Sequence, residues 1–204
     1  MKLSKKDIHT FFKAIRDKDN QKVIGLVSEN PEYINITRPS PPKKDEGQTG
    51  LQVALKTENF EIADFLIENG SDVNHKTGQP GNERWFPVLH AAIQATFFNS
   101  YTMRVDNTNF EKAFNLLKKM LEKKADPNIK DSIGNDCLTR AFLDANQMID
   151  NPAANLESTV FLAQINRIFK LIIEYGADIH SRDFHGKSIK EWIKEYDYIK
   201  YIKI

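Results

Sequence analysis

The side chains of this sequence that are best placed for chemistry gather near its C-terminal end. His180 and His185 lie five positions apart, among Asp178 and Asp183, and imidazole and carboxylate groups are common ligands of divalent metals. None of the five histidines has the spacing of a metal motif such as H-E-x-x-H. We therefore predict no metal site. A metal-binding protein or enzyme built around His180, Asp183 and His185 is the alternative.

The single cysteine, Cys137, is the other candidate for reactivity. It begins a predicted helix, where the helix dipole lowers a thiol pKa. One cysteine excludes an internal disulfide and a four-cysteine zinc site. The sequence also lacks a Gly-rich phosphate loop and a Ser/His/Asp arrangement. We predict a packed structural thiol, no cofactor and no enzymatic activity.

The composition is that of an ordinary globular chain. Its 204 residues include 29 basic and 28 acidic side chains, a net charge of +1, so no global field favours nucleic acid. Binding of nucleic acid by the Lys- and Arg-containing N-terminal face is a third interpretation. No apolar run reaches the length of a membrane span, and no apolar segment typical of a secretion signal follows the N-terminus. We expect a cytoplasmic monomer without membrane or nucleic-acid partners.

The elements that would position these side chains repeat along the chain. Similar turns occupy residues 69–74, 123–128 and 175–180, with a fainter copy at 32–35. Each of the three follows a run with apolar residues three and four positions apart, which predicts an amphipathic helix. Gly70 and Gly176 stand where a helix end favours a positive φ.

A second theme follows each turn and opens the next helix, at 47–54, 87–92, 131–141 and 183–188. Its clearest copy is Val88-Leu89-His90-Ala91-Ala92, and the clearest turn is Gly176-Ala177-Asp178-Ile179. Together these segments resemble the ankyrin-repeat family, whose helix-opening signature is T-P-L-H-x-A. The resemblance implies that His90 forms hydrogen bonds between neighbouring loops and that Asp178 and Asp183 order turns.

The resemblance also implies the fold. We predict an all-α chain, a single domain in which an ankyrin-repeat solenoid stacks about five helix-turn-helix units with finger loops. The predicted units are residues 1–37, 38–74, 75–128, 129–180 and 181–204.

The repeat spacing departs from the family. Asp72 and Asp126 are 54 positions apart and Asp126 and Asp178 are 52 apart, against a family period of about 33. We place the extra residues mainly between paired helices, at 97–109 and 145–156, and a smaller excess in the loop at 75–86.

The two ends carry helix-start signals. Ser4 is a predicted N-cap, and Ser188 to Glu191 has the sequence of a capping box. The closing run, 196–204, partly alternates polar and apolar residues as a strand does, and we interpret it as a short terminal helix.

A protein that repeats turns without catalytic groups is typically a binding module. We place partner contacts on the finger loops and the first insertion, because Trp and Arg are frequent at interface hot spots. Packing of Trp85 or Phe86 on the repeats, and a solvated spacer at 38–46, are the alternatives. The predicted partner-binding residues are Arg38, Lys43, Lys44, Asn82, Glu83, Arg84, Trp85, Phe86, Phe98 and Tyr101.

The predicted function is that of an adaptor or inhibitor that binds another protein. Within that class, a bacterial immunity protein and an effector-type protein both fit the residues, and the sequence does not choose between them.

Overall fold

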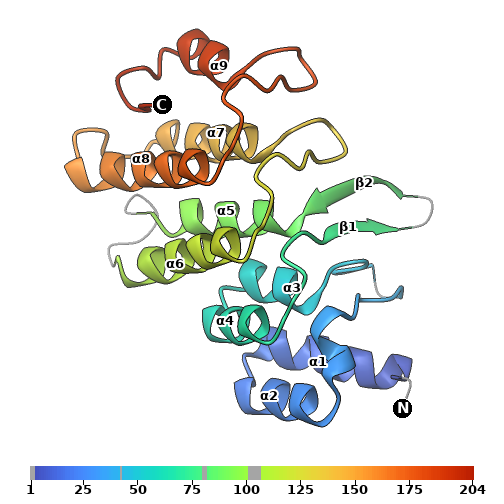
Figure 1. Ribbon diagram of the computed structural model, residues 1–204. Coiled ribbons are helices and arrows are strands. Elements are labelled where there is room, and N and C mark those ends of the chain that lie inside the picture. Colours follow the sequence, from blue (N-terminus) through green and yellow to red (C-terminus); the bar gives the residue numbers. More distant parts are fainter. Residues whose placement is uncertain (1–2, 42, 80–81, 101–106) are drawn as a thin grey trace.

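The computed structural model describes residues 3–41, 43–79, 82–100 and 107–204. The chain is mostly helical, with one short hairpin (Figure 1). Its elements are α1 (Lys5–Asp17), α2 (Asn20–Glu29), the 3-10 helix η1 (Pro31–Asn35), α3 (Gly50–Lys56), α4 (Phe60–Glu68), β1 (Lys76–Gln79), β2 (Asn82–Pro87), α5 (Val88–Phe98), α6 (Thr108–Glu122), α7 (Cys137–Ile149), α8 (Thr159–Glu174) and α9 (Ile189–Glu195).

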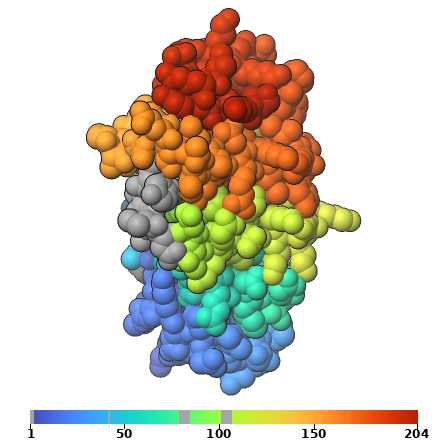
Figure 2. Space-filling view, turned by 90° about the vertical axis from the view of Figure 1, so that its left-hand side faces the viewer, coloured from blue at the N-terminus to red at the C-terminus, as the bar shows by residue number. Residues whose placement is uncertain are grey.

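Consecutive helices pack as pairs, and the pairs follow one another along the molecule (Figure 1). One helix of each pair forms a first row in which α1, α3, α5, α7 and α9 contact their neighbours in that order. The helices α2, α4, α6 and α8 form a second row in the same way. The colours of Figure 2 therefore succeed one another in sequence order from one end of the molecule to the other.

The connections between pairs project on one side of the molecule, next to the first row (Figure 1). We call them finger 1 (37–49), finger 2 (75–87), finger 3 (129–136) and finger 4 (181–188). Finger 2 contains the hairpin, in which Thr77 pairs with Phe86 and Gln79 with Asn82.

The predicted helix boundaries are confirmed at both ends of the chain. Ser4 and Asp7 form a capping box at the start of α1, and Ser188 and Glu191 form another at the start of α9. Gly70 and Gly176 each have a φ of +92° after α4 and α8, a conformation in which a side chain would be strained.

The structure departs from two predictions of secondary structure. The chain is mostly helical, as predicted, but the excess residues of finger 2 pair as a two-stranded hairpin of β1 and β2; Trp85 and Phe86 favour strands. The run after α9 is neither helix nor strand. Asp197 takes a left-handed φ of 55°, and the Tyr198 N–H donates to the Ile193 carbonyl at 2.9 Å, which ends the helix.

The long insertions partly lengthen helices. The helices α3 and α4 have 7 and 9 residues, whereas α5 and α6 have 11 and 15 and α7 and α8 have 13 and 16. The predicted insertion at 97–109 therefore begins within α5 and ends within α6, and 101–106 lie outside the described residues. Longer helices bury more apolar surface against neighbouring pairs.

Three asparagines connect the repeated turns. The side-chain oxygen of each asparagine accepts a hydrogen bond of 2.8 Å from the backbone N–H of an aspartate in the next turn. The donors to Asn35, Asn74 and Asn128 are Asp72, Asp126 and Asp178, in that order. Each asparagine also donates to a carbonyl of the same next turn, those of Gly70, Lys124 and Gly176. These bonds set the distance between successive pairs.

We expect Asn74→Ala to lower the free energy of unfolding by about 1 to 3 kcal/mol, because it leaves the Asp126 N–H and the Lys124 carbonyl without their partner. Asn74→Asp keeps the acceptor and loses the donor, so its loss should be smaller. Urea unfolding measures both variants. An alanine variant as stable as the unsubstituted protein would contradict this role.

Candidate partner-binding surface

The predicted contact residues of finger 1 have two different environments. Lys43 and Lys44 are exposed. Arg38 is only 5% exposed, and its guanidinium donates to His9 Nδ1 at 2.9 Å and lies 5.7 Å from the Phe12 ring centroid. Arg38 is therefore held in place by the first row.

In finger 2, Trp85 is half-buried, with the Lys76 ammonium 4.7 Å from its ring centroid, and Phe86 is exposed. The backbone of Asn82, Glu83 and Arg84 belongs to β2. The side chains of these three residues, and Tyr101 as a whole, lie outside what the structure describes, so their predicted contacts stay predictions.

Phe98 lies at the opposite end of α5 from finger 2. It is half-buried beside a small cavity of about 140 Å³ lined by Leu55, Lys56, Gln94 and Ala95 among others. An 11-residue helix is about 16 Å long. The described members of the predicted set are thus spread over separate places and do not form one patch.

Fingers 3 and 4 are built alike. The Asp131 carboxylate accepts from the N–H groups of Ile133 and Asn135 at 3.0 and 2.9 Å. The Asp183 carboxylate accepts from the N–H groups of His185 and Lys187 at 2.9 and 3.0 Å in the same way, as predicted for a turn-ordering aspartate. Gly134 and Gly186 take positive φ values of 84° and 71° in these turns.

Each finger contacts the next. His75 Nε2 lies 3.3 Å from the Gly47 carbonyl oxygen, the Ser132 N–H donates to the Trp85 carbonyl at 3.1 Å, and the Lys130 ammonium donates to the Arg182 carbonyl at 2.6 Å. A Cβ at Gly134 would lie 3.2 Å from the backbone nitrogen of Phe184. The fingers therefore form one continuous surface.

Large apolar side chains are exposed on this surface. Phe86 on finger 2, Ile133 on finger 3 and Phe184 on finger 4 are 44%, 56% and 79% exposed. Side chains of this kind on adjoining loops offer contact area to a partner.

A pocket of about 310 Å³ opens between fingers 3 and 4 and the helices α7 and α9; we call it the aromatic pocket. The ring centroid of Phe142 lies 6.1 Å from that of Trp192, in a stacked arrangement, and 5.5 Å from that of Tyr196, edge to face. The pocket is lined by Ile133, Asn135, Thr139, Phe142, Leu143, Asn146, Asp183, His185, Trp192 and Tyr196.

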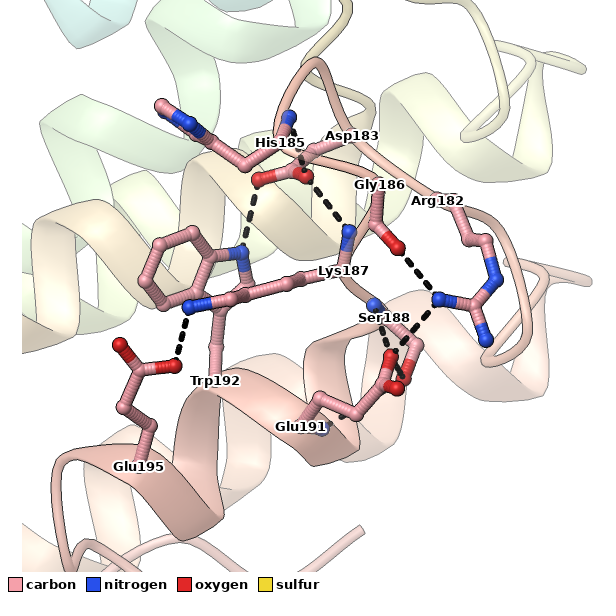
Figure 3. Close-up of polar contacts among 9 residues, drawn as sticks. All are labelled: Arg182, Asp183, His185, Gly186, Lys187, Ser188, Glu191, Trp192 and Glu195. Atoms are coloured by element: carbon pink, nitrogen blue, oxygen red, sulfur yellow. Dashed lines mark hydrogen bonds and ion pairs between the residues drawn. The ribbon is translucent and has the colours of Figure 1, made fainter.

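Finger 4 fixes the ring of Trp192 (Figure 3). Its indole N–H donates to Asp183 Oδ2 at 2.7 Å, on the same carboxylate that orders the turn. The Lys187 ammonium lies 4.3 Å from the ring centroid and pairs with Glu195 one turn further along α9. An aromatic side chain held in this way loses little further rotamer freedom on binding.

The residues of the metal alternative are engaged elsewhere. The Asp183 carboxylate accepts the two turn N–H groups and the Trp192 indole N–H. Among the described residues, no group of three His, Cys, Asp or Glu side chains is placed to hold a metal ion.

A comparison with known protein families matches residues 46–78 to the ankyrin repeat. Residues 46–78 form an ankyrin repeat. The match covers the end of finger 1, α3, α4 and the first three residues of β1. No curated protein matches the chain significantly. No helix in the described part of the chain is both long and apolar enough to cross a membrane.

The segment after this ankyrin repeat departs from the predicted role of His90. The side chain is 4% exposed, and neither ring nitrogen has a hydrogen-bond partner among the described residues. Burial, and to a lesser extent the positive charge of Arg140, lower the pKa of His90 to about 3. His90 is therefore a neutral core residue that does not connect loops, and the prediction is wrong.

Cys137 begins α7 as predicted, but its thiol is unreactive. The side chain is fully buried, and burial, together with the charges of Asp136 and Asp126, raises its pKa well above the usual value. Burial outweighs the helix dipole, so the thiol stays protonated, in agreement with a structural role.

The sequence did not reveal the aromatic pocket. Phe142 and Trp192 are 50 positions apart, and each fits the apolar pattern of its own helix. The available signal was the pair of fingers with Asp and Gly three positions apart, at 131–134 and 183–186. Equal turns in successive repeated units indicate that the helices following them lie side by side.

Proposed function

We propose that the chain binds another protein, as an ankyrin-type solenoid of about five units with the predicted boundaries. The partner contacts the fingers and the first row of helices. The aromatic pocket, lined in part by exposed Ile133, is the observation that supports this proposal, and exposed Phe184 lies between two of its lining residues, Asp183 and His185. Aromatic anchors in a preformed concavity are typical interface hot spots.

The role that we propose is that of an adaptor or inhibitor, acting as a cytoplasmic monomer without catalysis of its own. The ankyrin repeat at 46–78 supports a protein partner in general. An immunity protein and an effector-type protein are two forms of this role, and the identity of the captured partner separates them.

The test uses immobilised protein and extract from the cells that express it, with bound proteins identified and quantified by mass spectrometry. We expect Leu143→Asp, in the pocket, and Phe184→Asp, beside it on finger 4, each to reduce capture of the specific partner at least about 30-fold, because a charge at either position removes an apolar anchor worth more than about 2 kcal/mol. Val160→Asp is the matched control, since Val160 is exposed on α8 in the second row.

Thermal unfolding followed by circular dichroism verifies that all three variants are folded. A partner retained by both pocket variants, or lost equally with Val160→Asp, would overturn the proposed surface.

A further inference from the structure

A second pocket, of about 280 Å³, lies between α1 and finger 1, near the end of the molecule opposite α9 (Figure 1). We call it the basic pocket. Its lining residues are His9, Phe12, Lys13, Arg16, Asp17, Arg38, Lys44 and Asp45.

The two carboxylates of this pocket already have cationic partners. The Arg16 guanidinium binds both oxygens of Asp45, with Nε 2.5 Å from Oδ2, and Lys56 lies 3.7 Å from Oδ1. Lys13 pairs with Asp17 along α1. The negative charges of the pocket are thus compensated within the chain.

The positive charges of Arg38 and Lys44 are not compensated in this way. Within the described part of the chain, no carboxylate lies within ion-pair distance of either side chain. Lys44 is exposed, but Arg38 is 95% buried. A buried guanidinium normally has a carboxylate or a similar anion beside it, because water no longer solvates the charge.

Arg38 is also held rigidly. Its N–H donates to the Gln48 carbonyl at 2.9 Å, and its own carbonyl accepts from the Gly47 N–H at 2.8 Å. Its side chain lies over Phe12 and, among the described residues, donates one bond, to His9 Nδ1. A guanidinium carries five N–H donors, so most of its capacity is left for a ligand in the pocket that it lines.

We propose that the basic pocket receives an Asp or Glu side chain from an acidic segment of the partner protein. This inference rests on the proposed function and names the chemistry of a second contact, at the other end of the first row. Arg38 binds the carboxylate with parallel N–H bonds, the geometry that guanidinium and carboxylate groups share. Lys44 and the exposed Lys43 attract the neighbouring acidic residues of the segment.

The local charge favours a peptide over nucleic acid. Three cations, Arg38, Lys43 and Lys44, stand on one finger of a chain whose net charge is +1, and none of them has an ion pair with a described carboxylate. A nucleic acid requires a longer row of cations to neutralise successive phosphates.

The test is a titration of the full chain, labelled with ¹⁵N, with acetyl-Glu-Glu-Glu-amide at low ionic strength. We expect saturable NMR shifts of the Gly47 and Gln48 amides and of Arg38 Nε–H, with a millimolar dissociation constant that rises with added salt. The same peptide with Gln in place of Glu should cause no saturable shift.

Arg38→Gln should weaken binding about tenfold or more, because it removes charge-assisted hydrogen bonds in a desolvated site. Lys44→Gln, at an exposed position, should weaken it about 2- to 5-fold and leaves the fold intact. Lys170→Gln is the control, because Lys170 is exposed on α8.

Absent saturation, or unchanged affinity in both Arg38→Gln and Lys44→Gln, would overturn the proposal. Inorganic phosphate that binds the pocket more tightly than the triglutamate peptide would also overturn it, in favour of a phosphate ligand. The peptide replaces the natural partner, so this result is independent of whether the capture experiment identifies one.

Discussion

The substitution His90→Leu should raise the free energy of unfolding above that of the unsubstituted protein. The difference between the two proteins should grow as the pH falls below 6.5. At neutral pH we expect a gain of about 1 to 3 kcal/mol. The buried imidazole has lost its water and has no partner among the described residues, and leucine of similar size avoids that cost.

The pH dependence follows from the lowered pKa of His90. In the unfolded chain the imidazole binds a proton below about pH 6.5, whereas in the folded chain it stays neutral down to about pH 3. A lowered pKa gives stability that is present above pH 6.5 and is lost as the pH falls. Between pH 7.5 and 4.5 the loss is about 2 to 3 kcal/mol, and the leucine variant should not show it.

Asp144 on α7 acts in the opposite direction. Burial raises its pKa to about 6 despite its ion pair with Arg140. As the pH falls through 6, the folded protein binds a proton at Asp144 and its free energy of unfolding rises. This rise partly offsets the fall that His90 causes in the unsubstituted protein. The difference between the two proteins isolates the effect of His90.

The measurement is urea unfolding at half-unit steps from pH 7.5 to 4.5. His180→Leu is the matched control, because His180 is exposed, and its curve should run parallel to that of the unsubstituted protein. A constant difference between His90→Leu and the unsubstituted protein at every pH would contradict a neutral, buried His90.

Asp183→Ala should destabilise the last pair of helices and open the aromatic pocket. The carboxylate accepts from the N–H groups of His185 and Lys187 and from the indole of Trp192. Bonds to a charged acceptor are stronger than neutral ones, so we expect a loss of about 2 to 4 kcal/mol. Finger 4 lies at the end of the array, where this cost falls on one unit and appears as local unfolding.

Two measurements follow this change. Hydrogen exchange at the His185 and Lys187 amides should become faster, and the fluorescence of Trp192, recorded with Trp85→Phe as the background, should shift to the red. Asp183→Asn keeps one acceptor but turns an NH₂ group toward the indole N–H or the turn, so its effect should be intermediate.

Asp131→Ala provides the matched control. It removes the equivalent turn bonds in finger 3 and touches no tryptophan indole. It should therefore accelerate exchange at Ile133 and Asn135 and leave the fluorescence of Trp192 unchanged. Equal spectral shifts in both alanine variants would contradict a specific role of Asp183 in orienting that ring.

The repeated turns show how far local sequence determines this fold. Gly70 and Gly176 take the positive φ that their positions predicted, and Ser4 and Ser188 cap the helices that they were expected to begin. Each of these features depends on residues at most a few positions apart, so the sequence contains the whole physical cause. The ankyrin match at 46–78 includes the turn at Gly70.

The lengths of helices and the shape of finger 2 were harder to predict. Residues 97–98 and 145–149 continue helices because their apolar side chains pack on neighbouring pairs. In finger 2 the residues of β1 pair with those of β2. Tertiary packing thus decides the lengths of the helices, whereas the hairpin agrees with local strand propensity.

The sequence by itself thus determined the helix caps at Ser4 and Ser188 and the recurring turns. Only the tertiary structure decided that Cys137 is buried, that within the described residues His90 has no hydrogen-bond partner and Arg38 no carboxylate, and that Phe142, Trp192 and Tyr196 line one pocket. The residues that make these contacts are far apart in the sequence. Phe142 and Trp192 are 50 positions apart, and Arg38 and His9 are 29 positions apart. Their contacts depend on how whole helix pairs pack, a relation that no local pattern of residues contains.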